Sequence, residues 1–177
     1  MQTIAIIGLG NAPKAYWNTR HNAGFILVDR IGEIMQVIWL KKKLAWEAEF
    51  VFQDYKFKLV KLNNYINLSG EMLQKYFKHQ NIDPQQIWLC SDNIDIDFGK
   101  IKYNTISSGG SHNGLRSINQ HFSNQCHHLR IGIKEDAEII SIKDYVLADF
   151  KNHLNFTQEQ ILDILSEIIN RSAKNLK

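Results

Sequence analysis

One histidine, one aspartate and three asparagines are the side chains of this sequence that best fit hydrolytic chemistry. Histidine exchanges a proton near neutral pH, so His21 could act as a base, and Asp92 could fix its tautomer and stabilise its protonated form. The amides of Asn11, Asn67 and Asn113 do not titrate, but each offers a donor and an acceptor. Together these groups could hold a peptide backbone and stabilise an oxyanion. Any single asparagine could equally cap a helix or occupy a turn, so the hypothesis depends on the set.

The predicted elements place these residues where strands end and helices begin. Asn11 follows an apolar strand, Asp92 follows another, and His21 precedes a helix that Asn22 could cap. In open α/β sheets, the carboxyl ends of strands and the starts of helices meet at one rim. We therefore expect the five side chains to line one crevice at that rim, where His112 would join them.

Apolar periodicity predicts strands alternating with helices, together with one antiparallel hairpin. Ser69 could cap one helix, and Thr157 and Gln160 could form a capping box at the start of the last helix. This pattern predicts an α/β fold: a single domain over residues 1–177, built as a three-layer sandwich with a mixed, mostly parallel sheet and helices on both faces. The predicted strands are 3–7, 47–53, 56–62, 87–91, 100–103 and 129–133, and the predicted helices are 22–37, 69–78, 114–122 and a segment from Thr157.

Composition narrows the class of protein. The chain has 177 residues, of which 44% are hydrophobic and 22% charged, typical of a globular domain with one sizeable core. Cys90 and Cys126 are too few for a disulfide framework, and no basic leader or apolar run of membrane-spanning length is present. We therefore expect a cytoplasmic protein. A net charge of +3 permits an anionic partner without requiring one, and the run 41–43 of three lysines is more typical of a solvated turn than of a phosphate site.

Three other chemistries are not favoured. The run 8–13 follows a strand as a dinucleotide-binding loop would, but Pro13 replaces the third glycine. The run 109–113 ends in Asn113 where a serine nucleophile elbow needs glycine. His127 and His128 are adjacent, would point to opposite sides of a strand, and match no zinc-site spacing.

Five sequence blocks, in this order, resemble the signature of the bacterial-type peptidyl-tRNA hydrolase family, and the similarity runs from Ile4 to about Phe150. Asp144-Tyr145-Val146-Leu147 also matches. The blocks are Gly8-Leu9-Gly10-Asn11, Arg20-His21-Asn22-Ala23-Gly24-Phe25, Asn67-Leu68-Ser69-Gly70, Gly110-Ser111-His112-Asn113-Gly114-Leu115 and Leu129-Arg130-Ile131-Gly132-Ile133.

The resemblance implies hydrolysis of the ester between a peptide and the 3′ ribose of tRNA, by water that His21 activates and Asp92 helps to position. It implies a monomer acting on peptidyl-tRNA without a metal, cofactor or membrane. Alternatives are a non-catalytic RNA-binding relative and an enzyme for another acyl ester. The implied substrate-binding residues are Asn11, Tyr16, Asn67, His112 and Asn113, and the implied tRNA-binding residues are Arg130 and Lys102.

The sequence departs from the family pattern at a few positions. Asn104 stands where many relatives have a lysine thought to act with Arg130 on phosphate, and Lys100 or Lys102 could compensate. Ile66 replaces a methionine before the Asn67 block, which changes one apolar wall of the expected site.

Overall fold

The computed structural model describes residues 1–80, 82–104, 110–135 and 139–174, and within them the strands form one mixed sheet of seven strands. The strand order is β2-β3-β4-β1-β5-β7-β6. The four central strands, from β4 to β7, run parallel, whereas β2, β3 and β6 pair antiparallel with their neighbours. The bounds are β1 (Thr3–Gly8), β2 (Leu40–Lys41), β3 (Ala45–Phe52), β4 (Tyr55–Leu62), β5 (Ile87–Asp97), β6 (Ile101–Asn104) and β7 (His127–Lys134).

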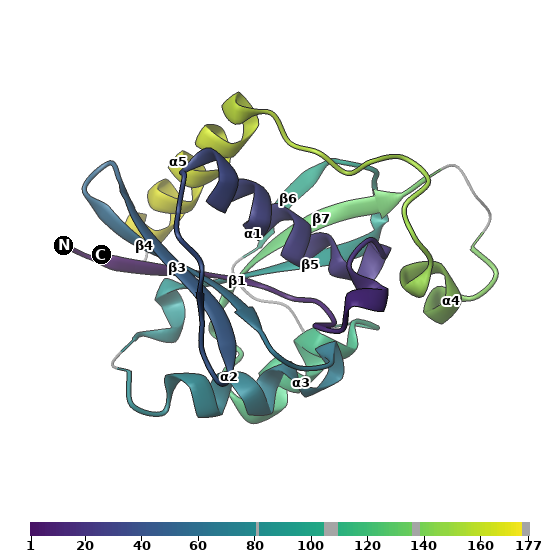
Figure 1. The fold of residues 1–177 in the computed structure, drawn as a ribbon, viewed down its shortest axis with the longest axis horizontal. Helices are drawn as coiled ribbons and strands as arrows, with labels where there is room; N and C mark the ends of the chain where they lie inside the picture. The colour runs from purple at the N-terminus through teal and green to yellow at the C-terminus, as the bar shows by residue number, and fades with distance from the viewer. Residues whose placement is uncertain (81, 105–109, 136–138, 175–177) are drawn as a thin grey trace.

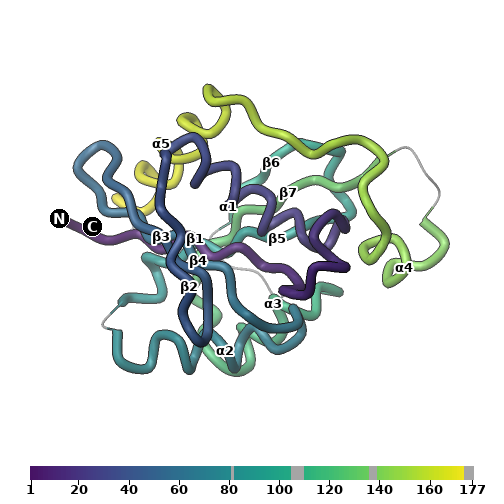
Figure 2. The backbone as a smooth tube through the Cα atoms, viewed as in Figure 1, coloured from purple at the N-terminus to yellow at the C-terminus, as the bar shows by residue number. Residues whose placement is uncertain are grey.

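Helices cover both faces of this sheet (Figure 1). The helices α1 (Ala23–Ile34) and α5 (Gln158–Lys174) lie on one face, and α2 (Ser69–Phe77) and α3 (Asn113–His121) lie on the other. The short helix α4 (Ile142–Leu147) lies beyond the end of the sheet toward which the carboxyl end of β1 points (Figure 2). The predicted three-layer α/β sandwich is confirmed. None of the helices in the described ranges combines the length and apolar character needed to cross a bilayer.

The central strand β1 explains why its sequence is apolar without alternation. Ile4 and Ile6 pack into the core under α1 and α5, whereas Ala5 and Ile7 pack into the core over α2 and α3. All four side chains are fully buried. A parallel strand covered on both faces needs apolar residues at every position, and this strand meets that need up to the glycine that ends it.

Two local predictions are confirmed in detail. At the start of α5, the Gln160 N–H donates to Thr157 Oγ1 at 3.2 Å and the Thr157 N–H donates to Gln160 Oε1 at 2.8 Å, which is a capping box. The strands β3 and β4 form an antiparallel hairpin. Its two turn residues, Gln53 and Asp54, have φ values of 47° and 62°, as the hairpin turn that matches strand twist requires.

The predicted caps of α1 and α2 are wrong, and α1 is shorter than expected. Asn22 makes no capping bond, because its side chain bonds the backbone of Asn11 instead. Ser69 is the first residue of α2, and its hydroxyl donates back to the Ile66 carbonyl. The helix α1 ends at Ile34 because Gln36 adopts a left-handed φ of 54°, which closes a Schellman motif.

Candidate functional site

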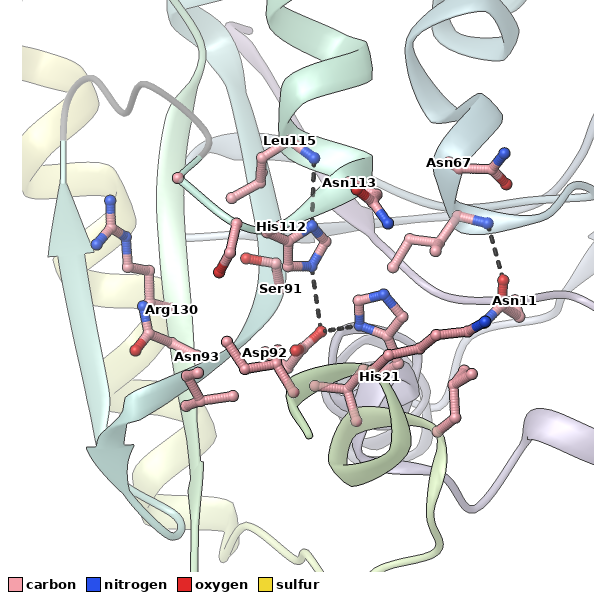
Figure 3. A pocket seen from close by; sticks show the side chains of 18 of the residues that line it. Asn11, His21, Asn67, Ser91, Asp92, Asn93, His112, Asn113, Leu115 and Arg130 are labelled. Carbon is pink, nitrogen blue, oxygen red and sulfur yellow. Dashed lines mark hydrogen bonds and ion pairs between the residues drawn. The ribbon is translucent and has the colours of Figure 1, made fainter. Parts of the chain in front are cut away.

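A crevice of about 690 Å³ opens at the carboxyl rim of the parallel strands (Figure 3). Every residue predicted to act in catalysis or to bind the substrate lines it, and so does Arg130. Lys102 is the one predicted site residue that does not line it. The predicted residues at the crevice are Asn11, Tyr16, His21, Asn67, Asp92, His112, Asn113 and Arg130.

His21 and Asp92 form a buried hydrogen-bonded pair. His21 lies in the 3₁₀ turn η2 (Arg20–Asn22), and its Nδ1 is 2.8 Å from Asp92 Oδ1. Their side chains are 9% and 3% exposed. The sequence had predicted that Asp92 follows its strand, and this is wrong, because Asp92 lies within β5. The pairing of β1 with β5 ends at Cys90, and β5 continues past the end of β1. No part of β1 therefore lies beside Asp92, and His21 contacts it there.

A second histidine shares the same carboxylate oxygen. His112 Nε2 lies 3.1 Å from Asp92 Oδ1, and His112 Nδ1 accepts the backbone N–H of Leu115 at 3.2 Å as the cap of α3. Since Nδ1 of His112 accepts a hydrogen bond, its Nε2 carries the hydrogen that it donates to Asp92. His21 donates in the same way from Nδ1. In neutral His21, the basic nitrogen is therefore Nε2.

Burial and the two imidazoles act in opposite directions on Asp92. Burial by itself would raise the pKa of the Asp92 carboxyl, but the charge of His112 and His21 and their hydrogen bonds outweigh it. The net pKa lies well below the usual 3.8. Asp92 is therefore an anion throughout the working range of pH, and it can stabilise a positive charge on its histidine partner.

Asn11 is held rigidly at the edge of the crevice. Its side-chain oxygen accepts the Ile66 N–H at 2.9 Å, while its backbone exchanges two hydrogen bonds with the Asn22 side chain at 2.8 and 3.0 Å. Because the oxygen is engaged, the amide NH₂ is the group that Asn11 offers to a ligand. We call the two bonds between the Asn22 side chain and the Asn11 backbone the clamp. It requires α1 to approach β5 closely, since a Cβ on Gly24 would lie 2.2 Å from the Cys90 carbonyl oxygen.

The other two amides reach the crevice from a 3₁₀ turn and from the start of α3. Asn67 is exposed in the 3₁₀ turn η3 (Ile66–Leu68), and Asn113 is the exposed first residue of α3 (Figure 3). The side-chain oxygen of Asn113 accepts from Arg116, so its NH₂ is also available as a donor. Tyr16 borders the crevice and packs edge-on against Tyr65, with ring centroids 6.2 Å apart. Several donors thus converge beside the base.

The cations predicted to contact tRNA lie side by side on two adjacent strands. The register of β6 and β7 pairs Lys102 directly with Arg130, so both side chains lie on one face. Asn104, which stands where relatives have a lysine, pairs with His128 instead. Lys100 precedes β6 and forms an ion pair with Asp97 at 2.5 Å. Lys102 is therefore the lysine best placed to act with Arg130.

Sequence reasoning missed the buried ion pair that holds one wall of the crevice. Arg20 Nε donates to Glu135 Oε2 at 3.0 Å, with the two residues 3% and 8% exposed. The Arg20 guanidinium also lies 4.4 Å from the Tyr145 ring centroid and donates to the Ala148 carbonyl. This network joins the turn that carries His21 to α4, whose residues line the crevice. A helix of six residues is too short for periodicity, and no local signal marks Glu135.

His21, Asp92 and His112 also form the one described cluster of metal-ligand side chains, with candidate ligand atoms within 4.8 Å of one another. Two histidines and a carboxylate are a ligand set found in hydrolytic zinc sites. Here the nitrogens that face Asp92 lie at hydrogen-bond distances from one carboxylate oxygen, and the remaining nitrogen of His112 accepts the Leu115 N–H. In this arrangement the three side chains form one hydrogen-bonded network centred on Asp92 Oδ1.

Fold and site together define the class of this protein: a three-layer α/β protein whose rim crevice brings a buried histidine–carboxylate pair together with several amides. Comparison with known proteins specifies it further. The family model described as peptidyl-tRNA hydrolase matches residues 5–177. The chain belongs to the peptidyl-tRNA hydrolase family.

Individual relatives agree with this assignment over nearly the whole chain. The chain is 37% identical over 174 residues to the peptidyl-tRNA hydrolase of Rickettsia bellii (strain OSU 85-389), covering 97% of this chain and 94% of that protein. It is 38% identical over 149 residues to that of Rickettsia prowazekii (strain Madrid E), covering 83% and 80%. The crystal structure of peptidyl-tRNA hydrolase from Acinetobacter baumannii superposes with a TM-score of 0.80 at 26% identity, covering 98% of this chain and 90% of that chain.

Proposed function

We propose that this chain hydrolyses the ester bond between peptide and tRNA in peptidyl-tRNA, with His21 as the general base and Asp92 as the group that orients it. Family membership makes the chain a carboxylic ester hydrolase of this substrate. The observation that carries the assignment of residues is the 2.8 Å bond from His21 Nδ1 to Asp92 Oδ1. Because Nδ1 is the donor in this bond, Nε2 is the nitrogen that can accept a proton from water.

The reaction follows from this arrangement in two steps. Nε2 of His21 removes a proton from water as the water oxygen attacks the ester carbonyl carbon, and Asp92 stabilises the imidazolium that results. The ester C–O bond then breaks as His21 returns the proton to the leaving 3′ oxygen, which frees the tRNA hydroxyl. The peptide acid releases the second proton of the water to solvent and becomes a carboxylate. General-base assistance of this kind is worth about 10²–10⁴ in rate.

The amides of Asn11, Asn67 and Asn113 supply the remaining stabilisation. In the tetrahedral intermediate the carbonyl oxygen becomes an anion, and an NH₂ donor already fixed in place binds it without reorganisation. The NH₂ groups of Asn11 and Asn113 are such donors, because the side-chain oxygen of each residue already accepts a hydrogen bond within the protein. One oxyanion donor contributes about 10²–10³ in rate. An ester is easier to cleave than an amide, so these groups suffice without a covalent intermediate.

Arg130 and Lys102 are the groups that we assign to tRNA phosphate. Two cations directly opposite each other on neighbouring strands repel one another, and a phosphate between them removes that repulsion. Contacts of this kind give affinity that falls as salt rises. We further propose that the chain acts as a monomer in the cytoplasm and needs no metal or organic cofactor for the reaction.

The test is release of peptide from N-acetyl-aminoacyl-tRNA by the purified protein and by His21→Ala. We expect wild-type turnover and a loss of about 10²-fold or more in kcat for the variant, with tRNA affinity retained. His79→Ala, which changes an exposed histidine just after α2, is the matched control and should keep full activity. Wild-type protein that binds deacylated tRNA but releases no peptide would instead identify an RNA-binding relative without catalysis.

A further inference from the structure

A second groove, of about 490 Å³, lies beside the catalytic crevice. Three of the four tryptophans in the chain line it, and the fourth, Trp88, is buried in the core. We call it the tryptophan groove and define it by Trp17, Phe25, Asp29, Trp39, Trp46 and Lys61.

The sheet places the tryptophan groove on the same rim as the crevice. It lies between α1 and the strands β3 and β4, and its strand residues include Lys61 and Leu62 at the carboxyl end of β4. Because β4 runs parallel to β1, the two carboxyl ends share one rim. The Ala12 N–H donates to the Asn64 carbonyl at 3.0 Å, and on these two segments Asn11 and Ile66 line the crevice whereas Ala12 and Asn63 line the groove. The groove and the crevice are therefore neighbours along the chain at both segments.

The groove is apolar, and its rings are accessible. Trp17 is 60% exposed and Trp46 37% exposed, although large aromatic side chains are normally covered. Trp17 is fixed in place, since its indole N–H donates to the Ala12 carbonyl at 3.0 Å. The one lysine in the lining, Lys61, lies over the Trp39 ring at 4.6 Å and is ion-paired with Asp29. Its charge is thus already balanced within the groove.

We propose that the tryptophan groove binds the peptide part of peptidyl-tRNA, through apolar side chains that lie several residues upstream of the ester. The inference rests on the proposed function. In the strand order, the site assigned to tRNA phosphate lies on β7, His21 faces the ends of β1 and β5, and the groove lies at β4 and β3. The ester joins the RNA to the peptide. With the ester at His21 and the RNA toward Arg130, the peptide leaves on the opposite flank, where the groove lies.

The principal rival occupant is single-stranded RNA, because aromatic rings with nearby lysines bind unpaired bases. Lys41 lies 5.5 Å from the Trp46 ring centroid, at the outer edge of the groove. Two features favour peptide. Lys61 is neutralised by Asp29, and the Arg130 and Lys102 pair lies on the far side of the crevice.

The experiment compares substrates that differ only in the peptide. They are N-acetyl-aminoacyl-tRNA and two N-acetylated hexapeptidyl-tRNAs with the same last residue, one carrying leucine and phenylalanine upstream and one carrying glycine and serine. Trp46→Thr removes a groove ring and introduces a β-branched residue, which suits a strand such as β3, and Trp46→Phe restores a ring. Val51→Ala, at an exposed apolar position of the same strand away from the groove, is the control.

We expect Trp46→Thr to raise KM for the apolar hexapeptidyl-tRNA about tenfold, the loss typical of a removed aromatic anchor. We expect Trp46→Phe to restore most of it, and kcat and the KM of the other two substrates to change less than about twofold. In a direct measurement that needs no turnover, fluorescence anisotropy of the labelled, free apolar hexapeptide should show binding to wild type and to Val51→Ala but not to Trp46→Thr.

The possible contrary results are distinct. An equal rise in KM for all three substrates, with weaker binding of deacylated tRNA, would assign the groove to RNA. Unchanged KM values throughout, with unchanged peptide anisotropy, would show that the groove binds neither part of the substrate. If wild type cleaves none of the three, the proposed function fails, and the anisotropy measurement alone still decides whether the groove binds peptide.

Discussion

Replacing Asp92 by asparagine separates the charge of that side chain from its geometry. The same oxygen, Oδ1, accepts hydrogen bonds from His21 at 2.8 Å and from His112 at 3.1 Å. An asparagine oxygen at that position can accept both N–H groups, so both rings keep their orientation. The negative charge is lost, and with it the stabilisation of the imidazolium that His21 becomes during the reaction.

The size of the loss follows from the distance between the charges. Two unit charges whose centres lie about 4 Å apart attract by about 4 kcal/mol at an effective dielectric constant of about 20. Neutral His21 in the ground state gains little of this energy, so almost all of it lowers the barrier. Since about 1.36 kcal/mol corresponds to a factor of ten in rate, Asp92→Asn should reduce kcat about 10³-fold.

The assay is single-turnover release of peptide from N-acetyl-aminoacyl-tRNA across a range of pH. Because the neighbouring imidazoles overcome the effect of burial and hold the pKa of Asp92 far below 3.8, wild type carries the charge throughout. The two rates are compared on the plateau of each protein's own pH–rate profile, so that a changed protonation of His21 in the variant does not enter the ratio. Asp95→Asn, at an exposed carboxylate that also lines the crevice, should stay within about twofold of wild type. Retention of more than a tenth of the wild-type rate by Asp92→Asn would refute the electrostatic role.

Three further predictions concern RNA, pH and metal. Arg130→Ala and Lys102→Ala should each weaken tRNA binding and lower the slope of log affinity against log salt by about 0.7–0.9, one phosphate contact each; an unchanged slope would remove that residue from the tRNA site. Burial, assisted by the charge of Arg130, lowers the pKa of His128 from 6.5 to about 4. As pH falls, His128 therefore becomes protonated at a higher pH in the unfolded chain than in the folded one. The free energy of unfolding should thus decline by up to about 3 kcal/mol as pH falls from 6.5 to about 4. In denaturant unfolding, His128→Gln should show a smaller decline with pH than wild type, and an equal decline would count against this explanation. Dialysis against EDTA should leave kcat unchanged. A loss of activity that zinc restores would instead show that His21, Asp92 and His112 bind a metal ion.

Short-range signals in the sequence were enough for most of the fold. The apolar run of β1, the hairpin of β3 and β4 and the capping box of α5 each depend on residues within a few positions of one another. Hydrophobic period and turn chemistry record such contacts directly. The same local reasoning failed for Asn22, because a cap and a distant clamp use the same side-chain atoms. The clamp to Asn11 forms only once α1 packs on β1 and β5.

The residues that line the crevice could also be predicted from the sequence. Their positions at strand ends and helix starts indicated them, and so did the order of the five sequence blocks that resemble the family. The residues that support them could not be predicted. Glu135 lies 115 positions from Arg20, and only the folded chain brings these buried charges together. Ion pairs between remote residues leave no periodicity to detect.

The sequence by itself determined which residue types the chain offers at each end of each element, since propensity and burial pattern are local. Only the tertiary structure decided that His21 and His112 share one oxygen of Asp92, that Lys102 lies opposite Arg130, and that tryptophans from separate elements line one groove. The physical reason is that strand order and register set these distances, and both are fixed by packing of the whole sheet between its helices.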